Sequence, residues 1–205
     1  MRARLARLAS LARTLPRLGL GNVATVALYR LALRSGLAER LTPDSSLAKG
    51  DLLSGKFLPQ PPEGIDAAEI RQRGVEIASG QLRWFSAHTF PVGSPPDWFR
   101  NPFNSTRASG TERHWSRLPD FDAALGDIKT IWEPSRFDWF GDLVRAARAT
   151  GDQAFLGTAN AWCRNWSDAN PPYRGHNWKC GQETSLRLLA VLHGAWLAGE
   201  IDRPT

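Results

Sequence analysis

The sequence predicts an all-α protein built from antiparallel helical hairpins, and three observations lead to that prediction. The 205 residues are 42% hydrophobic and 22% charged, the composition of a globular domain that can bury a core. Apolar residues recur at helical spacing after residue 120. A tight turn at residues 150–152 (TGD) separates two amphipathic segments of similar length. Such hairpins either stack as a solenoid or close as an α/α toroid, and periodicity alone leaves both open.

The N-terminal part of the chain is expected to hold two helices, a connector and a third helix. Residues 1–14 have the pattern of a basic amphipathic helix, and residues 23–35 have that of a second one. Residues 41–64 are rich in Pro, Gly and Ser, which favour irregular connections. Asp66 is a suitable N-cap, so we expect a helix to begin there and to end at Gly80.

The rest of the sequence, after Gly80, predicts a short strand and three further helices. We expect the strand near residues 84–90 and the helices over residues 135–149, 152–167 and 179–198. The aligned face of the first of these helices consists of Phe137, Phe140, Val144 and Ala147. The aligned face of the second helix consists of Phe155, Ala159, Trp162 and Trp166. The aligned face of the third helix consists of Leu186, Leu189, His193 and Trp196.

The net charge of +6 belongs to one end of the chain. Residues 1–40 hold eight arginines and one acidic residue, Glu39, whereas the other 165 residues hold 18 basic and 19 acidic groups. The body is therefore near neutral, and no nucleic-acid partner is expected. The basic arm is expected to make at most weak contact with a membrane surface, and packing against the body is the alternative.

Tryptophan is the second unusual feature of the composition. Eight of the nine tryptophans lie between Trp84 and Trp178. Flat indoles serve both as core anchors and as stacking surfaces for sugars, and both interpretations stay open. Cys163 and Cys180 show neither a CxxC pair nor metal-ligand spacing, so no metal and no cofactor are expected. We expect free thiols, with a disulfide as the alternative in an oxidising compartment.

Three segments carry more polar and aromatic residues than helix packing requires: residues 95–102, 127–137 and 170–187. Each combines an indole, a carboxylate or carboxamide, and a guanidinium, which is the chemistry of a groove that binds sugars. The alternative is a set of loops held by internal hydrogen bonds at helix ends. Under that alternative Asn177 is an N-cap, and Glu183 and Arg187 form a surface ion pair at i, i+4.

Several short motifs, most of them within these segments, stand out together. They are Asp97-Trp98 with Asn101-Pro102, the run KTIWEPSR from Lys129 to Arg136, Thr150-Gly151-Asp152, and Asn177-Trp178 with Glu183 and Arg187. In order and spacing they resemble the N-terminal helical domain of the heparinase II/III-like polysaccharide lyases, a family with relatives that act on alginate. The resemblance covers roughly residues 65–200.

The resemblance implies an incomplete (α/α) toroid followed by an antiparallel β-sandwich domain. Within this chain it implies a basic helical arm over residues 1–40, a connector over residues 41–64 and the N-terminal part of the toroid over residues 65–205. The sequence ends just after a predicted helix with no evident capping element, so we expect the chain to be an N-terminal fragment that lacks this downstream domain.

The resemblance also implies β-elimination on uronate-containing polysaccharides. A carboxamide neutralises the uronate carboxylate and acidifies the C5 proton, a Tyr or His base removes that proton, and an acid protonates the departing O4. Asn177 matches the neutralising residue, and His176 beside it is a candidate assistant. The base is expected beyond residue 205, so the fragment alone is expected to lack full lyase activity.

The other matched residues are expected to shape the groove, to bind substrate or to brace Asn177; they are Trp98, Asn101, Trp132, Glu133, Arg136, Trp178, Glu183 and Arg187. The expected partner is an acidic, uronate-containing polysaccharide. The resemblance favours the bacterial periplasm, although no clear signal peptide is evident, and the cytoplasm is the alternative. Two other functions stay open: a non-catalytic protein for glycan binding or envelope-polysaccharide assembly, and a glycoside hydrolase, for which Glu133 and Glu183 would be the two carboxylates.

Overall fold

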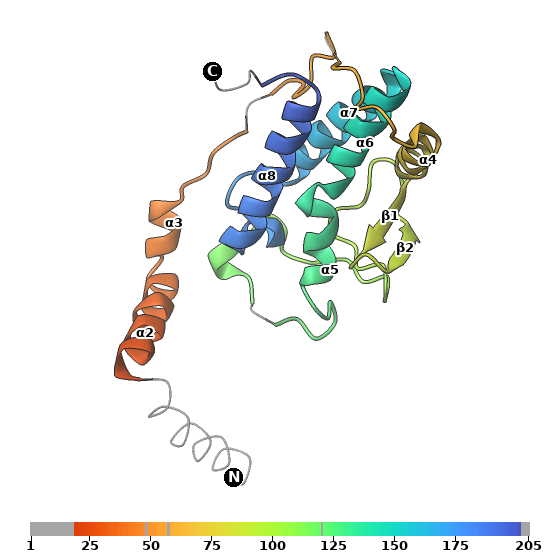
Figure 1. Ribbon diagram of the computed structural model, residues 1–205. Helices are drawn as coiled ribbons and strands as arrows, with labels where there is room; N and C mark the ends of the chain where they lie inside the picture. The colour runs from red at the N-terminus through yellow and green to blue at the C-terminus, as the bar shows by residue number, and fades with distance from the viewer. Residues whose placement is uncertain (1–18, 48, 57, 120, 202–205) are drawn as a thin grey trace. The chain divides into compact units, whose positions relative to one another are not determined.

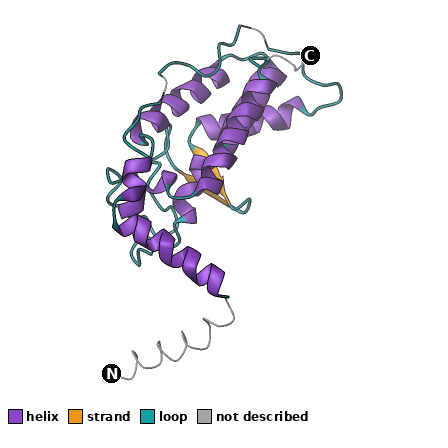
Figure 2. Ribbon diagram, turned by 90° about the vertical axis from the view of Figure 1, so that its left-hand side faces the viewer, coloured by secondary structure: helices purple, strands orange, loops and turns teal. Residues whose placement is uncertain are grey.

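The computed structural model describes residues 19–47, 49–56, 58–119 and 121–201 (Figure 1). The chain divides into two compact units, Met1–Pro43 and Asp44–Thr205. Helices make up most of the regular structure, and a small two-stranded sheet accompanies them (Figure 2). A largely helical fold is therefore confirmed. The helix expected over residues 1–14 lies outside the described residues.

The first unit contains helices α2 (Leu20–Arg34) and α3 (Leu37–Leu41). Gly36 joins them with a φ of 76°, a left-handed conformation that glycine adopts without steric cost. Neither helix has a buried residue. The expected helix over residues 23–35 is therefore present but begins earlier, at Leu20.

The second unit begins its regular structure with helix α4 (Ala67–Ala78). The Asp66 carboxylate accepts hydrogen bonds from the N–H groups of Ala68 and Glu69 at 3.0 and 3.1 Å, which confirms the predicted N-cap. After α4 the chain turns at Gly80, whose N–H donates to Ile77 O at 2.8 Å. The helix thus ends where the sequence predicted.

A β-hairpin replaces the single strand that the sequence predicted. Strands β1 (Gln81–Trp84) and β2 (His88–Pro91) pair antiparallel, with Leu82 opposite Phe90 and Trp84 opposite His88. Phe85 in the connecting turn has a φ of 51°, which gives the handedness that tight hairpins need. Leu82 and Trp84 point to the core, so the hairpin is anchored by one face of β1.

The remaining helical elements are the 3₁₀ turn η1 (Trp115–Arg117), α5 (Lys129–Trp132), the 3₁₀ turn η2 (Glu133–Arg136), α6 (Asp138–Thr150), α7 (Ala154–Ala169), the 3₁₀ turn η3 (His176–Trp178) and α8 (Gly181–Leu197). Helix α6 lies among the longer helices and contacts α4, α7 and α8 (Figure 1). The turn between α6 and α7 contains Gly151 at a φ of 72°, as expected for a helix hairpin.

The aligned faces of α6 and α7 form the core, as the periodicity predicted. Phe140 and Val144 on α6 are completely buried, and Trp162 and Trp166 on α7 are 1% and 2% exposed. Five tryptophans in all are buried core anchors: Trp84, Trp98, Trp139, Trp162 and Trp166. Burying each indole removes a large apolar area from water, which is the main favourable term in the stability of such a core.

The apolar face that the sequence predicted for helix α8 does not point into the core. Its buried residues are Glu183, Arg187 and Gly194. Leu186, Leu189 and Trp196, which the periodicity aligned, are 37%, 62% and 52% exposed, and His193 is also exposed. Polar residues point inward because partners on other segments satisfy them, as described below.

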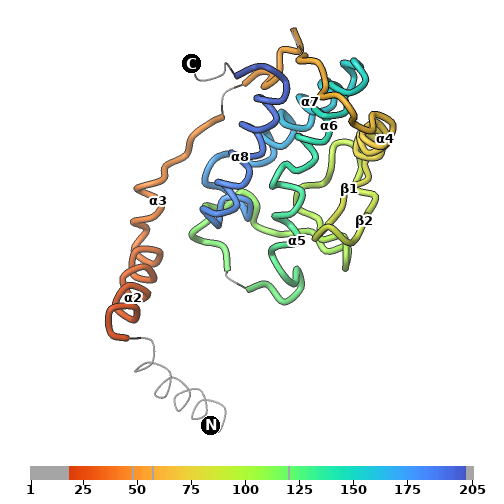
Figure 3. Tube along the Cα trace, viewed as in Figure 1, coloured from red at the N-terminus to blue at the C-terminus, as the bar shows by residue number. Residues whose placement is uncertain are grey.

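The expected connector packs closely on α7 and on the residues after α8. The side chain of Asn160 accepts from the N–H groups of Leu52 and Leu53 and donates to Leu53 O, so one carboxamide replaces a neighbouring strand. Glu200 Oε1 accepts from Ser54 N and Gly55 N at 2.6 and 3.0 Å. Figure 3 shows this segment running beside the end of α8.

A search of the described helices found none long and apolar enough to span a bilayer. Cys163 and Cys180 are both free cysteines, which agrees with the expected thiols. Burial raises the pKa of the Cys163 thiol to about 12, so this side chain is protonated and unreactive at neutral pH.

Candidate functional site

An ion-pair cluster joins η2 to the first turn of α8. Arg136 Nη1 lies 2.5 Å from Glu133 Oε2, and its Nε and Nη2 donate to the two Glu183 oxygens at 2.6 and 2.8 Å. The pair with Glu183 is bidentate, the strongest arrangement for a guanidinium and a carboxylate. The hydrogen bond with Glu183 and the charge of Glu133 raise the pKa of Arg136.

Local backbone geometry places this cluster. Pro134 occupies the first turn of η2, where its missing N–H costs nothing. Phe137 then adopts a φ of 68°, which ends η2 and lets α6 begin at Asp138. This break explains why the helix predicted over residues 135–149 begins later than expected. It also turns Arg136 away from the axis of α6 and toward Glu183.

Arg187 lies one turn further along α8 and is almost completely buried. Its Nε donates to Ser135 O at 2.7 Å, and its Nη2 donates to Asn177 O at 2.9 Å. The guanidinium carbon lies 4.2 Å above the ring centre of Trp166, a close cation–π contact. Burial lowers the pKa of Arg187 to about 10, so the side chain is still charged at neutral pH.

The interpretation of Glu183 and Arg187 as a surface ion pair is therefore wrong. Both side chains are buried, and Glu183 pairs with Arg136. The N-cap interpretation of Asn177 is also wrong, because Asn177 lies within η3 and Cys180 precedes α8. The expected bracing of Asn177 by Arg187 is present as a hydrogen bond to the main-chain oxygen of Asn177.

Asn177 has no exposed surface in this structure. Its Nδ2 donates to Asn170 Oδ1 at 2.8 Å, and Asn170 Nδ2 in turn donates to Trp166 O at 2.9 Å. The amide nitrogen expected to meet a substrate carboxylate is thus bonded to the protein and out of reach of a ligand. In the geometry described, Asn177 is a residue that holds the loop before α8.

Two buried polar atoms beside each other in the sequence lack a partner among the described residues: Asn177 Oδ1 and His176 Nδ1. Unpaired buried polar atoms are uncommon in folded proteins and often mark functional positions. Burial lowers the pKa of His176, and the nearby charge of Lys179 lowers it further against the opposite effect of Asp122. The imidazole is therefore neutral near pH 7 and can accept or donate one proton.

Two half-buried indoles flank this centre. Trp132 Nε1 donates to His176 O at 2.8 Å, which ties α5 to η3. Trp178 Nε1 donates to Asn170 O at 3.1 Å. The ring centres of Trp178 and Tyr173 are 5.8 Å apart. With the polar edge of each indole occupied, the exposed part of each ring can act as an apolar surface.

Two residues matched by the resemblance lie in the core, away from this centre. Trp98 is 2% exposed, its ring packs against Trp139 and Trp162, and its Nε1 donates to Asn165 Oδ1. Asn101 is 4% exposed and donates to Leu125 O at 2.8 Å. A stacking or hydrogen-bonding role toward a ligand is therefore not available to them, since the protein itself covers their functional groups.

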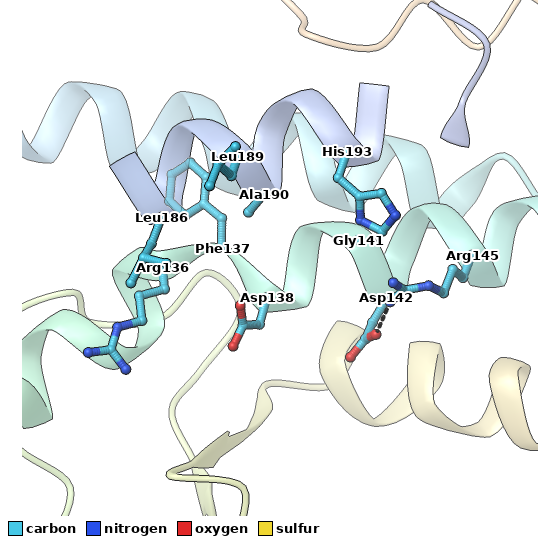
Figure 4. A pocket seen from close by; sticks show the side chains of 10 residues that line it. All are labelled: Arg136, Phe137, Asp138, Gly141, Asp142, Arg145, Leu186, Leu189, Ala190 and His193. Atoms are coloured by element: carbon cyan, nitrogen blue, oxygen red, sulfur yellow. Dashed lines mark hydrogen bonds and ion pairs between the residues drawn. The ribbon is translucent and has the colours of Figure 1, made fainter. Parts of the chain in front are cut away.

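A groove of about 520 Å³ opens beside Arg136, between α6 and α8 (Figure 4). Its α6 wall carries Asp138, Asp142 and Arg145, and its α8 wall carries Leu189 and His193. Acidic, basic and apolar groups therefore line one open surface next to the ion-pair cluster. No group of His, Cys, Asp and Glu side chains suited to holding a metal occurs in the described part of the chain.

The structure also brings in residues that sequence reasoning missed. Ser135 and Trp166 contact Arg187, and Asn170 accepts from Asn177, yet none of these three stood out as a site residue. Phe85 is 45% exposed, and its N–H donates to Glu133 Oε1 at 3.0 Å, so the hairpin turn reaches the cluster. The positive φ required at residue 85 gave no sequence signal, because phenylalanine rarely adopts it.

Comparison with protein-family models, with curated proteins and with solved structures found no match for this chain.

Proposed function

We propose that the chain is part of a polysaccharide lyase that cleaves uronate-containing glycans by β-elimination. One observation carries the proposal. Two of the motifs that carry the resemblance, residues 129–136 and 177–187, converge through the bonds of Arg136 to Glu183 and of Arg187 to Ser135 O, and Trp132 donates to His176 O beside the second motif. Segments more than 40 residues apart thus form one cluster of charges, amides and indoles.

The proposed toroid is supported by helix α8. Leu188, Leu189, Leu192 and Trp196 form an exposed apolar surface on it, while α6 covers its opposite face. Such a helix is typical of the interior of a helical array, where neighbours lie on both sides. In the proposal, the next hairpin of the toroid covers this surface.

The role of each residue in the proposed site is assigned by how exposed its side chain is. Trp132 and Trp178 offer partly exposed indole surfaces for stacking on sugar rings, and Arg136, with 24% of its side chain exposed, donates to a uronate carboxylate. Asn177 and Arg187 are positioning residues for the loop that carries Trp178. A direct neutralising role for Asn177 requires its amide to leave Asn170 when substrate binds.

A second candidate is a glycan-binding protein without catalysis. The observation that favours it is the burial of Asn177, because a fully enclosed amide cannot neutralise a carboxylate. This candidate uses the same indoles and Arg136 but needs no base for proton transfer.

Two measurements test the proposal. Calorimetric titration of this chain with uronate oligosaccharides is expected to show binding that neutral oligosaccharides do not show. Arg136→Lys, which loses the bidentate pair with Glu183 that holds the cation in place, is expected to weaken the binding of uronate oligosaccharides roughly tenfold. Arg71→Lys, at an exposed position on α4 outside the cluster and the groove, is the matched control.

The catalytic part is tested on the complete open reading frame that contains this chain, by the ultraviolet absorbance of unsaturated uronate. Absorbance on a uronate polymer supports the lyase. Binding without absorbance leaves the glycan-binding candidate, and new reducing ends without absorbance indicate a hydrolase. If the folded protein neither binds nor cleaves a uronate polymer, both proposals are contradicted.

A further inference from the structure

Three exposed aromatic side chains lie together at the turn of the β-hairpin, within the second unit. Phe85 and Phe103 are 45% and 46% exposed, their ring centres are 6.1 Å apart, and the angle between their planes is 25°. The ring of His88, which is also exposed, meets Phe103 edge-on at 5.4 Å. We call these three residues the aromatic tip. Rings grouped on a surface in this way are a common mark of a binding site.

The backbone holds the aromatic tip in an unusual conformation. Phe85 and Ser86 both have a positive φ, 51° and 57°, which residues other than glycine rarely adopt. The buried Asn101 side chain accepts the N–H of Phe103 at 2.9 Å and donates to Leu125 O at 2.8 Å. The turn that presents Phe85 and the loop that presents Phe103 are therefore both fixed by the protein.

A hollow of about 480 Å³ adjoins the aromatic tip. Phe90 and Pro102 line this hollow, and the Phe90 ring lies 4.8 Å from the Phe103 ring. Arg100 lines it as well and is exposed, and within the described part of the chain its side chain has neither an ion pair nor a hydrogen bond. The hollow thus places a free guanidinium near aromatic rings.

The acidic group of the hollow is already neutralised. Only Asp97 and Arg100 are charged among the residues that line it. Both oxygens of Asp97 accept from Arg107 Nε, at 3.2 and 3.0 Å. Because the charge of Arg107 offsets that of Asp97, a bound anion would meet Arg100 as the uncompensated charge.

The aromatic tip also contacts the ion-pair cluster of the candidate site. The N–H of Phe85 donates to Glu133 Oε1, and the other oxygen of Glu133 pairs with Arg136. The ring contacts of Phe103 with Phe85 and with Phe90 continue from there to the hollow. A chain of contacts therefore runs from the cluster through the aromatic tip to the hollow.

We propose that the aromatic tip and the hollow form a second subsite for uronate-containing glycans. A sugar ring stacks on the exposed faces of Phe85 and Phe103, and Arg100 binds a carboxylate of the same glycan. The ligand must offer both an apolar face and a carboxylate, and a uronate sugar has both. The inference rests on the proposed function for the class of ligand only, since none of these residues belongs to the ion-pair cluster.

The charge is tested by calorimetric titration of the full chain with hexasaccharides prepared from pectin, alginate and heparosan, with maltohexaose as the neutral comparison. Arg100→Gln is expected to weaken binding of the preferred uronate hexasaccharide about tenfold, because one charged hydrogen-bond donor is lost. Arg83→Gln is the matched control and should leave binding unchanged. It removes an exposed arginine of β1 that does not line the hollow.

The aromatic tip is tested by Phe103→Ala, which is expected to weaken binding about fivefold, whereas Phe103→Tyr keeps the ring and should restore it. Phe121→Ala, which removes an 89% exposed phenylalanine elsewhere on the surface, is the matched control. Circular dichroism and urea unfolding of each variant show whether it is folded.

The outcomes separate this inference from the proposed function. If Arg136→Lys weakens binding but Arg100→Gln and Phe103→Ala do not, the second subsite is wrong and the proposed function stands. If only Arg100→Gln and Phe103→Ala weaken it, the second subsite is supported and the role proposed for Arg136 is wrong.

Three further results would overturn the second subsite. Equal binding of maltohexaose and the uronate hexasaccharides removes the role of Arg100. Binding of no hexasaccharide removes the subsite itself, whereas the lyase is still tested separately by absorbance. Self-association that Phe103→Ala abolishes, without binding of a hexasaccharide, would show that a second copy of the chain covers the aromatic tip.

Discussion

Arg187 is a cation inside an aromatic core, held by directional contacts. Its guanidinium lies over the Trp166 ring and donates to two main-chain oxygens, those of Ser135 and Asn177. A lysine ammonium can neither stack in this way nor reach both oxygens in one plane. The residue therefore joins three segments, η2, η3 and α8, at one point.

We predict that Arg187→Lys lowers the free energy of unfolding by about 1–3 kcal/mol, because at least one buried carbonyl loses its donor. Urea unfolding followed by tryptophan fluorescence measures the change. Arg71→Lys on the exposed side of α4 is the control and should change stability by less than about 0.5 kcal/mol. An unchanged midpoint for Arg187→Lys would contradict the described contacts.

Because the pKa of His176 is lowered in the folded protein, we expect the stability of the protein to depend on pH. The folded pKa of His176 lies below the ordinary value of 6.5 because the imidazole is buried and Lys179 is near. The unfolded chain therefore binds a proton that the folded chain resists, and stability falls as pH drops below about 6.5 toward the folded pKa.

We predict that His176→Gln reduces the loss of thermal stability between about pH 7 and about pH 5, because glutamine has no proton to bind in this range. The measurement is the unfolding temperature of both proteins at each pH. His193→Gln, an exposed histidine on α8, is the matched control. The prediction is wrong if both variants and the parent protein lose the same amount.

At the scale of the elements, the packing of α6 on α8 depends on one glycine. A Cβ added to Gly194 would lie 2.4 Å from two ring carbons of Phe140, which has no exposed surface. The close approach of the two helices therefore requires the absence of a side chain at this position.

We predict that Gly194→Ala destabilises the protein, since overpacking typically costs about 1–3 kcal/mol and exceeds the helix-propensity gain of up to about 1 kcal/mol. Gly157→Ala on α7 is the matched control, because a Cβ there meets nothing within 4 Å. That control should stabilise by about 0.5–1 kcal/mol. Equal effects of the two substitutions in chemical unfolding would contradict the described packing.

At the scale of the whole molecule, the two units differ in both packing and charge. Every buried apolar residue of the described chain lies between Leu53 and Ala198, so the core belongs to the second unit. The first unit holds eight basic residues and one acidic residue, whereas the second unit is near neutral. Stability and basicity are therefore properties of different parts of the chain.

We predict that deleting residues 1–43 leaves the cooperative unfolding of the second unit unchanged to within about 0.5 kcal/mol. The cut lies before Asp44, which pairs with Arg174 and should be kept. Calorimetry and urea unfolding of the truncated chain provide the measurement. A loss of several kcal/mol would mean that the first unit completes the core.

Local patterns explain the parts of the fold that the sequence predicted. The Asp66 N-cap, the turn at Gly151 and the inward faces of α6 and α7 depend on residues within one or two helical turns of each other. Such short-range rules hold whenever the apolar stripe of a helix meets the core. The hairpin of β1 and β2 was only partly predicted, because its turn uses a positive φ at Phe85.

The sequence predicted the types of residue in the candidate site better than it predicted their positions and exposure. Trp132, Glu133, Arg136, Glu183 and Arg187 do lie together, as their phrases suggested. Trp98 and Asn101 do not, and Asn177 is enclosed. Exposure depends on which segments cover a residue, and a linear pattern of polarity contains no information about that.

By itself the sequence determined the helical class, the helix ends set by local caps and turns, and the concentration of positive charge in the first 40 residues. Only the tertiary structure decided the orientation of α8, which buries Glu183 and Arg187 and exposes its leucines. The reason is physical: a buried charge is tolerated only where partners meet it. Here those partners, Arg136 and the main-chain oxygen of Ser135, lie about 50 residues earlier in the chain.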